Sequence, residues 1–374
     1  MKKLLSLILA LGMLLALCAC GTSGATETDV EPEASETVEN AELAEEPDAE
    51  QESEVASDTE SIAAEDASGE MGSSSHGPSG ERTGGPTIGG GGMGGMQKND
   101  PALTALLEEV ENKYIQDEYT DEETGLTVPY NLYAPDNFAE ISYPMVTFIT
   151  DMSVVGRDTT AALEQGYGGV IWASAEDQEK HPCVVLVPEF PTTIITDTEA
   201  SDYVELMPRM ILAVAEKYNV DLDRLYATGQ SMGCMTFLNV TANNPDLFAA
   251  ELFVSGQQPI EILTPLETQS FIYITAGGDM NASGGADEVM AMFDADGISY
   301  SVSFGWDAQA DAEELNGLAE AMLSEGQSKN FARFEAGTVL AEGASTQGAA
   351  EHMASFDYAY SISALRDWLF QQSK

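Results

Sequence analysis

The sequence predicts an α/β domain, with a mainly parallel sheet covered by helices on both faces, behind a long segment that has no fold of its own. Three observations support this prediction. Apolar runs typical of buried strands alternate with amphipathic segments long enough for helices. A serine between two glycines stands where one such run ends and a helix-like segment begins. Residues 20–97 hold too few large apolar side chains to form a core.

The first elements of the domain follow one another from about residue 98. A helix is expected over 101–114, and a strand with alternating character over 125–135. Continuous apolar runs rich in β-branched residues occupy 144–150 and 183–190, as expected for strands buried on both faces. Apolar positions at spacings of three and four then predict an amphipathic helix between 202 and 220.

The same alternation continues to the end of the chain. Further strands are expected over 224–229, 249–256, 271–278, 298–306 and 330–337, and helices over 232–244, 307–329 and 362–372. Strands separated by helices of this length imply parallel pairing, because each connection must cross back over a face of the sheet.

The amino terminus has the pattern of an export signal. Lys2 and Lys3 precede an apolar run over 4–17 that is too short to span a bilayer as a stable helix. The sequence LCAC that follows is typical of a bacterial lipoprotein signal, in which cleavage after Ala19 leaves Cys20 as a lipid-bearing first residue. An ordinary secretory signal is the alternative. Either one predicts an exported protein, and the first predicts a membrane anchor on the extracytoplasmic side.

Composition divides the chain into a signal peptide (1–19), a linker (20–97) and a folded domain (98–374). The linker is acidic at first and then rich in glycine, which predicts a self-repelling tether that ends in a flexible hinge. The formal net charge of the chain is −50, and residues 97–374 alone hold 45 acidic and 11 basic residues. A surface of this charge repels polyphosphates, so nucleic acid is excluded as a partner and a neutral substrate is favoured.

Cysteine and histidine usage predicts neither a metal nor another cofactor. The chain has no HExxH motif and no Cys–His zinc spacing. Beyond the signal its cysteines are Cys183 and Cys234, for which buried free thiols are favoured and one disulfide is the alternative. The histidines are His76, His181 and His352, of which His181 is expected to be structural.

The motif Gly229-Gln-Ser231-Met-Gly233 follows a predicted strand and precedes a predicted helix. In that context G-x-S-x-G is the nucleophile elbow of α/β-hydrolases. The turn is so tight that side chains at 229 and 233 would collide with the backbone of the neighbouring strand and helix, which glycine avoids. The turn lifts the Ser231 hydroxyl above the sheet, where the dipole of the helix that begins at Met232 is directed.

Three passages carry a closer resemblance. They are GLTVPYNLYAPDNF, SAEDQEKHPCVVLVPEFP and, as the most specific, YNVDLDRLYATGQSMGCMTFLNVTANNPDLFAA. From about residue 118 to its end, the chain resembles secreted α/β-hydrolases of the polyhydroxybutyrate-depolymerase-like esterase and "predicted peptidase" group. The resemblance implies an α/β-hydrolase fold and a serine hydrolase activity.

A serine hydroxyl needs a base to remove its proton, and in this fold the order along the chain is serine, acid, histidine. His352 is the one histidine after Ser231, which predicts that it is the base. Asp279 follows the strand-like FIYITAGG, where the resembling group carries the aspartate that orients the histidine. Asp307 is the second candidate for the acid, and Asp357 the third.

The oxyanion of an acyl-transfer intermediate requires about two backbone N–H groups. One is expected from Met232, directly after the nucleophile, and the other from the loop after the strand over 144–150. The resembling group usually has His-Gly in that loop, whereas this chain has Thr150 and Asp151. Met152 or Asp151 can still donate an N–H, but an inward-pointing carboxylate would disfavour the oxyanion.

These observations predict a lipid-anchored, extracytoplasmic serine hydrolase that cleaves carboxylic esters through an acyl-enzyme and needs no cofactor. The expected substrate is a neutral ester, and esters linked to a polysaccharide or polyester are the candidates. The helix expected over 307–329 is a candidate lid over the acyl pocket. Two alternatives stay open, a serine peptidase of the same fold and a non-catalytic surface binding protein with a decayed oxyanion loop.

Overall fold

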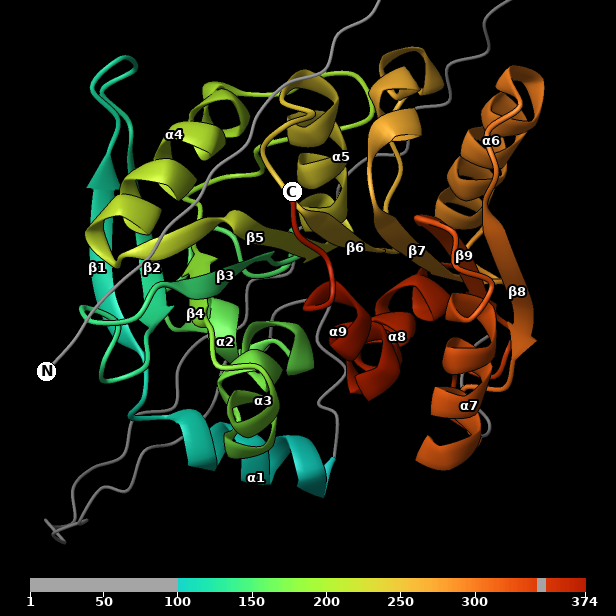
Figure 1. Ribbon diagram of the computed structural model, residues 1–374, viewed down its shortest axis with the longest axis horizontal. Helices are drawn as coiled ribbons and strands as arrows, with labels where there is room; N and C mark the ends of the chain where they lie inside the picture. The colour runs from blue at the N-terminus through green and yellow to red at the C-terminus, as the bar shows by residue number, and fades with distance from the viewer. Residues whose placement is uncertain (1–99, 342–347) are drawn as a thin grey trace, which may run out of the picture. The chain divides into compact units, whose positions relative to one another are not determined.

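The computed structural model describes residues 100–341 and 348–374, and these form a sheet with helices on both faces (Figure 1). The expected signal peptide, the lipidation site at Cys20 and the linker over 20–97 lie outside the described residues. No helix in the described ranges combines the length and apolar character that crossing a membrane requires.

The sheet is mainly parallel, as the sequence predicts. Its strands are β1 (Ile115–Thr120), β2 (Thr127–Tyr133), β3 (Tyr143–Ile149), β4 (Val184–Pro188), β5 (Val220–Gln230), β6 (Ala250–Val254), β7 (Phe271–Ala276), β8 (Ser301–Trp306) and β9 (Lys329–Phe334). They lie in the order β1-β2-β4-β3-β5-β6-β7-β9-β8. β2 is antiparallel to both of its neighbours, and every pair from β4 to β8 is parallel.

Two layers of helices cover the sheet, with α4, α5 and α6 on one face and the other α-helices on the opposite face (Figure 1). The helices are α1 (Pro101–Val110), α2 (Ala161–Glu164), α3 (Ala175–Lys180), α4 (Asp202–Lys217), α5 (Met232–Asn243), α6 (Met280–Asp296), α7 (Ala312–Leu323), α8 (Gly348–Ser361) and α9 (Ser363–Leu369). Short 3-10 helices cover Tyr167–Gly169, Ile171–Ala173, Ile260–Ile262 and Thr264–Thr268.

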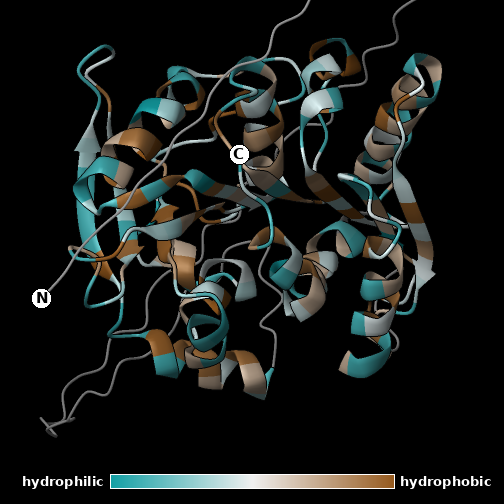
Figure 2. Ribbon diagram, in the orientation of Figure 1, coloured by the Kyte–Doolittle hydropathy of each residue, from teal (hydrophilic) through white to brown (hydrophobic). Residues whose placement is uncertain are grey.

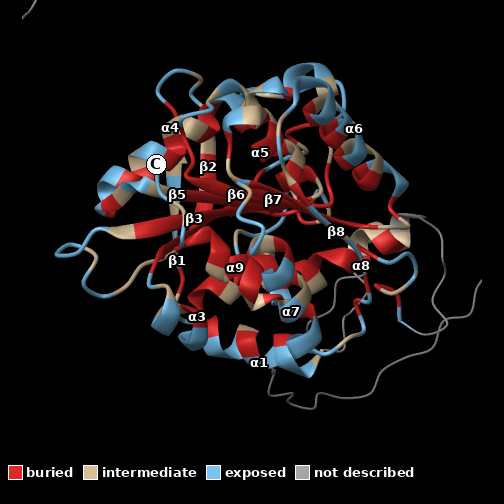
Figure 3. Ribbon diagram, turned by 45° about the vertical axis from the view of Figure 1, so that its right-hand side comes forward, coloured by how far each residue is buried: buried red, intermediate tan, exposed pale blue. Residues whose placement is uncertain are grey.

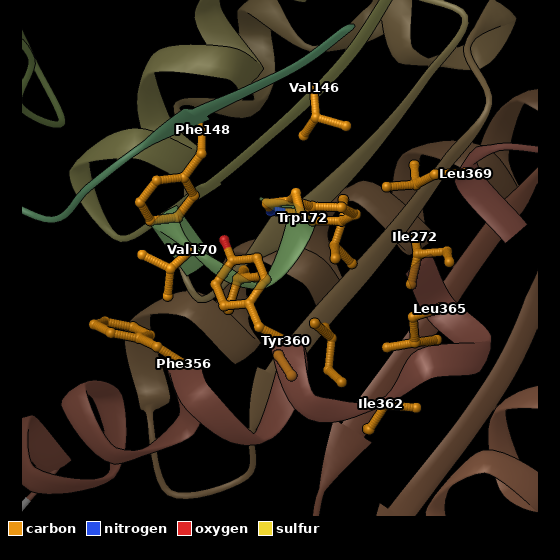
Figure 4. Close-up of a cluster of buried hydrophobic side chains, with 14 of the residues drawn as sticks. Val146, Phe148, Val170, Trp172, Ile272, Phe356, Tyr360, Ile362, Leu365 and Leu369 are labelled. Carbon is orange, nitrogen blue, oxygen red and sulfur yellow. The ribbon is translucent and has the colours of Figure 1, made fainter. Parts of the chain in front are cut away.

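Each face of the sheet has its own apolar core, because successive side chains of a strand point to opposite faces. In β3, Met145 packs in the core under α4 and α5, whereas Phe148 packs in the opposite core. Figure 4 shows Phe148 in that second core beside Trp172 and Tyr360. Hydropathy and burial follow the same division, with apolar, buried strands between helices whose outer sides are polar and exposed (Figures 2 and 3).

Some elements differ from the sequence-based expectation. Strand β1 and helices α6 and α8 have no counterpart among the expected elements, and α6 ends at Gly297 in a left-handed C-cap. Gly284 and Gly285 lower the intrinsic helix propensity of α6 near its start. Packing of Ala286, Val289 and Phe293 against the sheet overrides that weak local preference.

The expectation of a lid over 307–329 is wrong. Within this segment α7 buries Leu315, Ala319 and Met322 in the same core as β9 and α9. It is therefore the helix of the crossover connection that the parallel pairing of β8 and β9 requires. Its apolar side covers the sheet and not a substrate site.

Glu251 is a charged residue type inside the apolar sheet. It is fully buried in β6, where Thr241 Oγ1 donates to Glu251 Oε1 at 2.8 Å. Burial raises the pKa of this carboxyl to about 8, with the Thr241 hydrogen bond acting in the opposite direction. At neutral pH the folded chain therefore holds a proton that the unfolded chain releases.

We predict that Glu251→Gln weakens the dependence of stability on pH. Between the ordinary pKa of 4.5 and the folded value of about 8, the fold binds the extra proton. The free energy of unfolding therefore falls as pH rises, by about 1.4 kcal/mol per pH unit. Glutamine removes this titration, so Tm at pH 8 relative to pH 5 should rise in the variant. Glu288→Gln, at an exposed position, is the control, and an unchanged pH profile for Glu251→Gln would contradict the assignment.

Candidate active site

The predicted site residues follow the carboxyl ends of neighbouring parallel strands. Asp151 and Met152 follow β3, Ser231 follows β5 and Asp279 follows β7. Because parallel strands end at one edge of the sheet, the loops that carry these residues converge there. His352 lies in α8, which follows β9 in the chain, and its side chain meets Ser231 at the same edge.

The turn from β5 to α5 has no room for side chains at its two glycines. A Cβ at Gly229 would lie 2.4 Å from the carbonyl carbon of Gly233, and a Cβ at Gly233 would lie 1.9 Å from the carbonyl oxygen of Ile149. Between them Ser231 adopts φ 51° and ψ −114°, a conformation that is costly for a residue with a side chain. Its N–H donates to the carbonyl of Val254 at 3.1 Å, which ties the strained turn to β6.

Ser231, His352 and Asp279 form a continuous chain of hydrogen bonds. Ser231 Oγ lies 2.8 Å from His352 Nε2, and His352 Nδ1 lies 2.6 Å from Asp279 Oδ2. An ionised carboxylate only accepts hydrogen bonds, so the imidazole proton resides on Nδ1 and the lone pair of Nε2 faces the serine hydroxyl. The side chain of His352 is 25% exposed and that of Asp279 is 6% exposed, so the acid is shielded while the imidazole meets solvent.

The acid and the base are each held by a helix. Asp279 is the N-cap of α6, and its Oδ1 accepts from the N–H of Ala282 at 3.3 Å. His352 lies within α8, with the ring of Phe356 edge-on at 5.1 Å between centroids. The helical setting of His352 is a feature that the sequence analysis missed.

Two serines behind the imidazole also escaped the sequence analysis. Ser355 Oγ donates to the carbonyl of His352 at 2.8 Å, so its oxygen is free to accept from Ser255 Oγ, also at 2.8 Å. Ser255 is fully buried at the end of β6 and has a positive φ of 46°. This pair connects α8 to the strand beside the nucleophile.

The other two candidates for the acid have different partners. Asp307 Oδ1 accepts from the N–H of Gln309 at 2.9 Å, after β8. Asp357 Oδ1 accepts from the N–H of Tyr167 at 3.0 Å. The carboxylate in hydrogen-bond contact with His352 is that of Asp279.

The carboxylate of Asp151 is bound within the protein. The residue is 1% exposed, and its Oδ1 accepts from the N–H of Ser153 at 2.6 Å while its Oδ2 accepts from Gln230 Nε2 at 3.3 Å. The same Gln230 amide donates to Gln165 Oε1 at 2.9 Å. The negative charge of Asp151 is therefore held by donors on the loop after β3 and on the residue before Ser231.

The candidate oxyanion donors differ in how they are engaged. The N–H of Met232 belongs to the first residue of α5, and a helix offers no internal acceptor at that position. The N–H of Asp151 is directed at Gln165 Oε1 over a long 3.4 Å. Met152, next along the loop, is 55% exposed. The roles of Met232 and Met152 as oxyanion donors stay predictions.

Cys183 and Cys234, the cysteines within the described ranges, do not form a disulfide. Cys183 and Cys234 are both free and fully buried, and they lie in the opposite cores of the sheet. Burial raises the pKa of the Cys234 thiol far above its ordinary value. Although Cys234 stands three residues after Ser231, it is therefore an unreactive thiol.

His181 has a structural role, as expected. Its Nε2 lies 2.8 Å from Asp367 Oδ1, and its ring stacks on Phe370 with centroids 4.5 Å apart. This pair ties α3 to the carboxyl-terminal helix. Across residues 100–341 and 348–374, no three His, Cys, Asp or Glu side chains are grouped as a metal ion would require.

Comparison with known proteins supports the fold. No family model matches the chain, and no curated protein sequence matches it. A solved structure of a thermostable esterase is 22% identical, with a TM-score of 0.52 over 70% of this chain and 64% of that chain. This chain thus spans less than two thirds of that esterase. The likeness and the sheet order confirm the predicted α/β-hydrolase fold.

Two further structures are more distant. A mutant of the feruloyl esterase module from Clostridium thermocellum, complexed with sinapinate, is 14% identical over 68% of this chain and 87% of that chain, with a TM-score of 0.46. S-formylglutathione hydrolase from Staphylococcus aureus is 10% identical over 69% of this chain and 98% of that chain, with a TM-score of 0.44.

We predict that Gly233→Ala severely destabilises the domain. The added Cβ would lie 1.9 Å from the backbone carbonyl oxygen of Ile149. Because a backbone atom cannot rotate away as a side chain can, α5 must move away from β3. The expected loss is at least about 3 kcal/mol in the free energy of unfolding, measured by denaturant titration. Gly284→Ala is the matched control, since nothing lies within 4 Å of its Cβ position, and it should add about 0.5–1 kcal/mol. Equal stability of the two variants would rule out the crowding argument.

Proposed function

We propose that the chain is a serine hydrolase that cleaves carboxylic esters. The observation that carries the proposal is the hydrogen-bonded chain from Ser231 Oγ through His352 to Asp279, with distances of 2.8 and 2.6 Å. An activated serine of this kind forms an acyl-enzyme, which water then hydrolyses. The α/β-hydrolase fold accommodates this chemistry at the same edge of the sheet.

In the proposed reaction, Ser231 Oγ attacks the acyl carbon while His352 Nε2 accepts the hydroxyl proton. Asp279 keeps the other imidazole proton on Nδ1 and stabilises the imidazolium. The backbone N–H groups of Met232 and Met152 bind the oxyanion. His352 then protonates the leaving alcohol, and a water activated by the same imidazole releases the acid. No step of this reaction uses a cofactor or metal.

The acidic surface supports a neutral substrate, as the sequence predicts, and the exposed apolar side chains near the site suggest an apolar acyl or alcohol group. Met152, in the loop after β3, is 55% exposed, and Met280, the first residue of α6 directly after Asp279, is 76% exposed. Polysaccharide- or polyester-linked esters fit this description. The closer relationship to the polyhydroxybutyrate-depolymerase-like group rests on the sequence passages quoted above.

The cellular context is a separate part of the proposal. The LCAC signal supports an exported lipoprotein anchored through Cys20, on the extracytoplasmic side of a bacterial membrane. Residues 20–97 would then be the tether between that anchor and the domain from residue 98 onward.

We expect a fluorophosphonate probe to label the native protein and not Ser231→Ala. The substitution should lower kcat for a nitrophenyl ester by at least about 10⁴-fold and leave Tm nearly unchanged, because it removes the nucleophile and little packing. Ser373→Ala, an exposed serine at the chain end, is the control and should label normally. Equal labelling of Ser231→Ala would show that the mechanism is wrong.

The same measurements distinguish the two alternatives. A peptidase would cleave peptide amides with a higher kcat/KM than esters that have the same acyl group. A non-catalytic binding protein would show no turnover of either class and no labelling. The hydrogen bonds that the Asp151 carboxylate accepts from Ser153 and Gln230 weaken this last alternative, because these donors compensate the charge that would disfavour an oxyanion.

We predict that Met280→Ser reduces the preference for longer acyl or alkyl groups. If Met280 contacts an apolar part of the substrate, kcat/KM for a hexanoate ester should fall about 5- to 10-fold, whereas that for the acetate ester should change little. Leu212→Ser is the control, since Leu212 is also exposed but lies on α4. An equal loss for both esters would contradict a role in chain-length preference.

A further inference from the structure

Glu351, the residue before His352, is a buried carboxylate that accepts hydrogen bonds from two different loops. It is 4% exposed. Its Oε2 accepts from the N–H of Gly278 at 2.9 Å, and its Oε1 accepts from the N–H of Gly337 at 3.0 Å. Both bonds are assisted by the carboxylate charge and are therefore among the stronger hydrogen bonds in a protein.

The two loops belong to the site. Gly278 directly precedes Asp279, so the bond between residues 278 and 351 lies one residue before the contact between Asp279 and His352. Two neighbouring links then join the same two segments, one through Glu351 and one through the imidazole. The first link fixes how far the acid-bearing loop stands from the base-bearing helix.

The second bond of Glu351 extends the same support to β9. Gly337 lies in the loop after that strand, and the N–H of Gly277 donates to the carbonyl of Phe334 at 2.9 Å. The ends of β7 and β9 are thus joined by backbone, and Glu351 bonds to the loop that follows each of them. The acid loop is held from two sides.

The Glu351 carboxylate is tightly packed against the backbone of Gly278. A Cβ at Gly278 would lie 2.0 Å from Glu351 Oε1, so the backbone approaches the carboxylate as closely as glycine allows. Glu351 also lies in the first turns of α8, where the helix dipole favours a negative charge. Packing, hydrogen bonding and the dipole therefore all hold the carboxylate in this position.

We propose that Glu351 is a positioning residue that sets the Asp279–His352 geometry by clamping the loop before Asp279 onto α8. It contacts neither the nucleophile nor the site of the reacting atoms and acts through its two backbone bonds. The inference rests on the proposed function for the roles of Asp279 and His352. The clamp itself is a statement about geometry and can be tested without turnover.

The informative substitution is Glu351→Gln. Glutamine keeps the size of the side chain but offers one acceptor oxygen and one NH₂ group, which would face a second N–H donor. One of the two backbone bonds is then lost without a large cavity. Glu351→Asp keeps both oxygens but draws them back by one methylene, so it should show a smaller effect of the same kind.

We expect Glu351→Gln in the full chain to lower kcat for a nitrophenyl ester about 10- to 100-fold, with KM within about 2-fold of the native value. Fluorophosphonate labelling should slow in parallel. The low-field proton resonance of His352 Nδ1–H, which reports the short bond to Asp279, should weaken or shift. Glu335→Gln is the matched control, because it changes the same charge on the exposed part of the β9 loop and should leave all three readouts unchanged.

An unchanged low-field resonance together with native kcat in a folded Glu351→Gln protein would overturn the proposal. A fall in Tm alone, without a change in that resonance, would also overturn it, because the role would then be only structural. If the native chain hydrolyses no ester, the proposed function fails, but the resonance still tests the clamp.

If Glu351→Gln does not fold, amide hydrogen exchange of the unaltered chain provides the test. Gly278 and Gly337 lie in loops with solvent access, where unbonded amides exchange rapidly. The clamp predicts strong protection at both amides, and rapid exchange at either one would overturn it.

Discussion

The turn between β5 and α5 is the constraint on which the site depends. The backbones of β3, β5 and α5 approach so closely that neither Gly229 nor Gly233 has space for a Cβ, and Ser231 is left with a positive φ. A single strained residue in this position cannot rotate away without separating a helix from the sheet. The rigidity of the nucleophile therefore comes from backbone contacts, and the hydrogen bond to Val254 adds to it.

The remaining groups of the site are held by polar bonds that join segments distant in sequence. Gln230 and Gln165 bind the Asp151 side of the site, and Glu351 binds the loop before Asp279. A pair of serines fixes α8 to the end of β6. The chain has a large net negative charge. The buried carboxylates of Asp151 and Glu351 accept hydrogen bonds from uncharged backbone and amide N–H groups, and not from any Lys or Arg side chain in the described part of the chain.

Much of the fold could be predicted because its signals are local. Apolar runs with β-branched residues identified the central strands, and the spacing of apolar residues identified α4 within a few residues of its bounds. The helix α6, with glycines near its start, and the helix that carries His352 had weak local signals, and they form because tertiary packing supports them. The sequence of 307–329 is equally compatible with a lid, because it cannot show that α7 packs in the core beside β9.

The sequence by itself determined the strand–turn–helix that presents Ser231, because steric exclusion at two glycines acts over five residues. It also singled out His352, since no other histidine follows the serine. Only the tertiary structure decided which carboxylate meets the imidazole, where the Asp151 charge is directed, and that Glu351 joins two loops. Those choices depend on contacts between residues far apart in the chain, and such distances follow from the order of the strands in the sheet and not from local pattern.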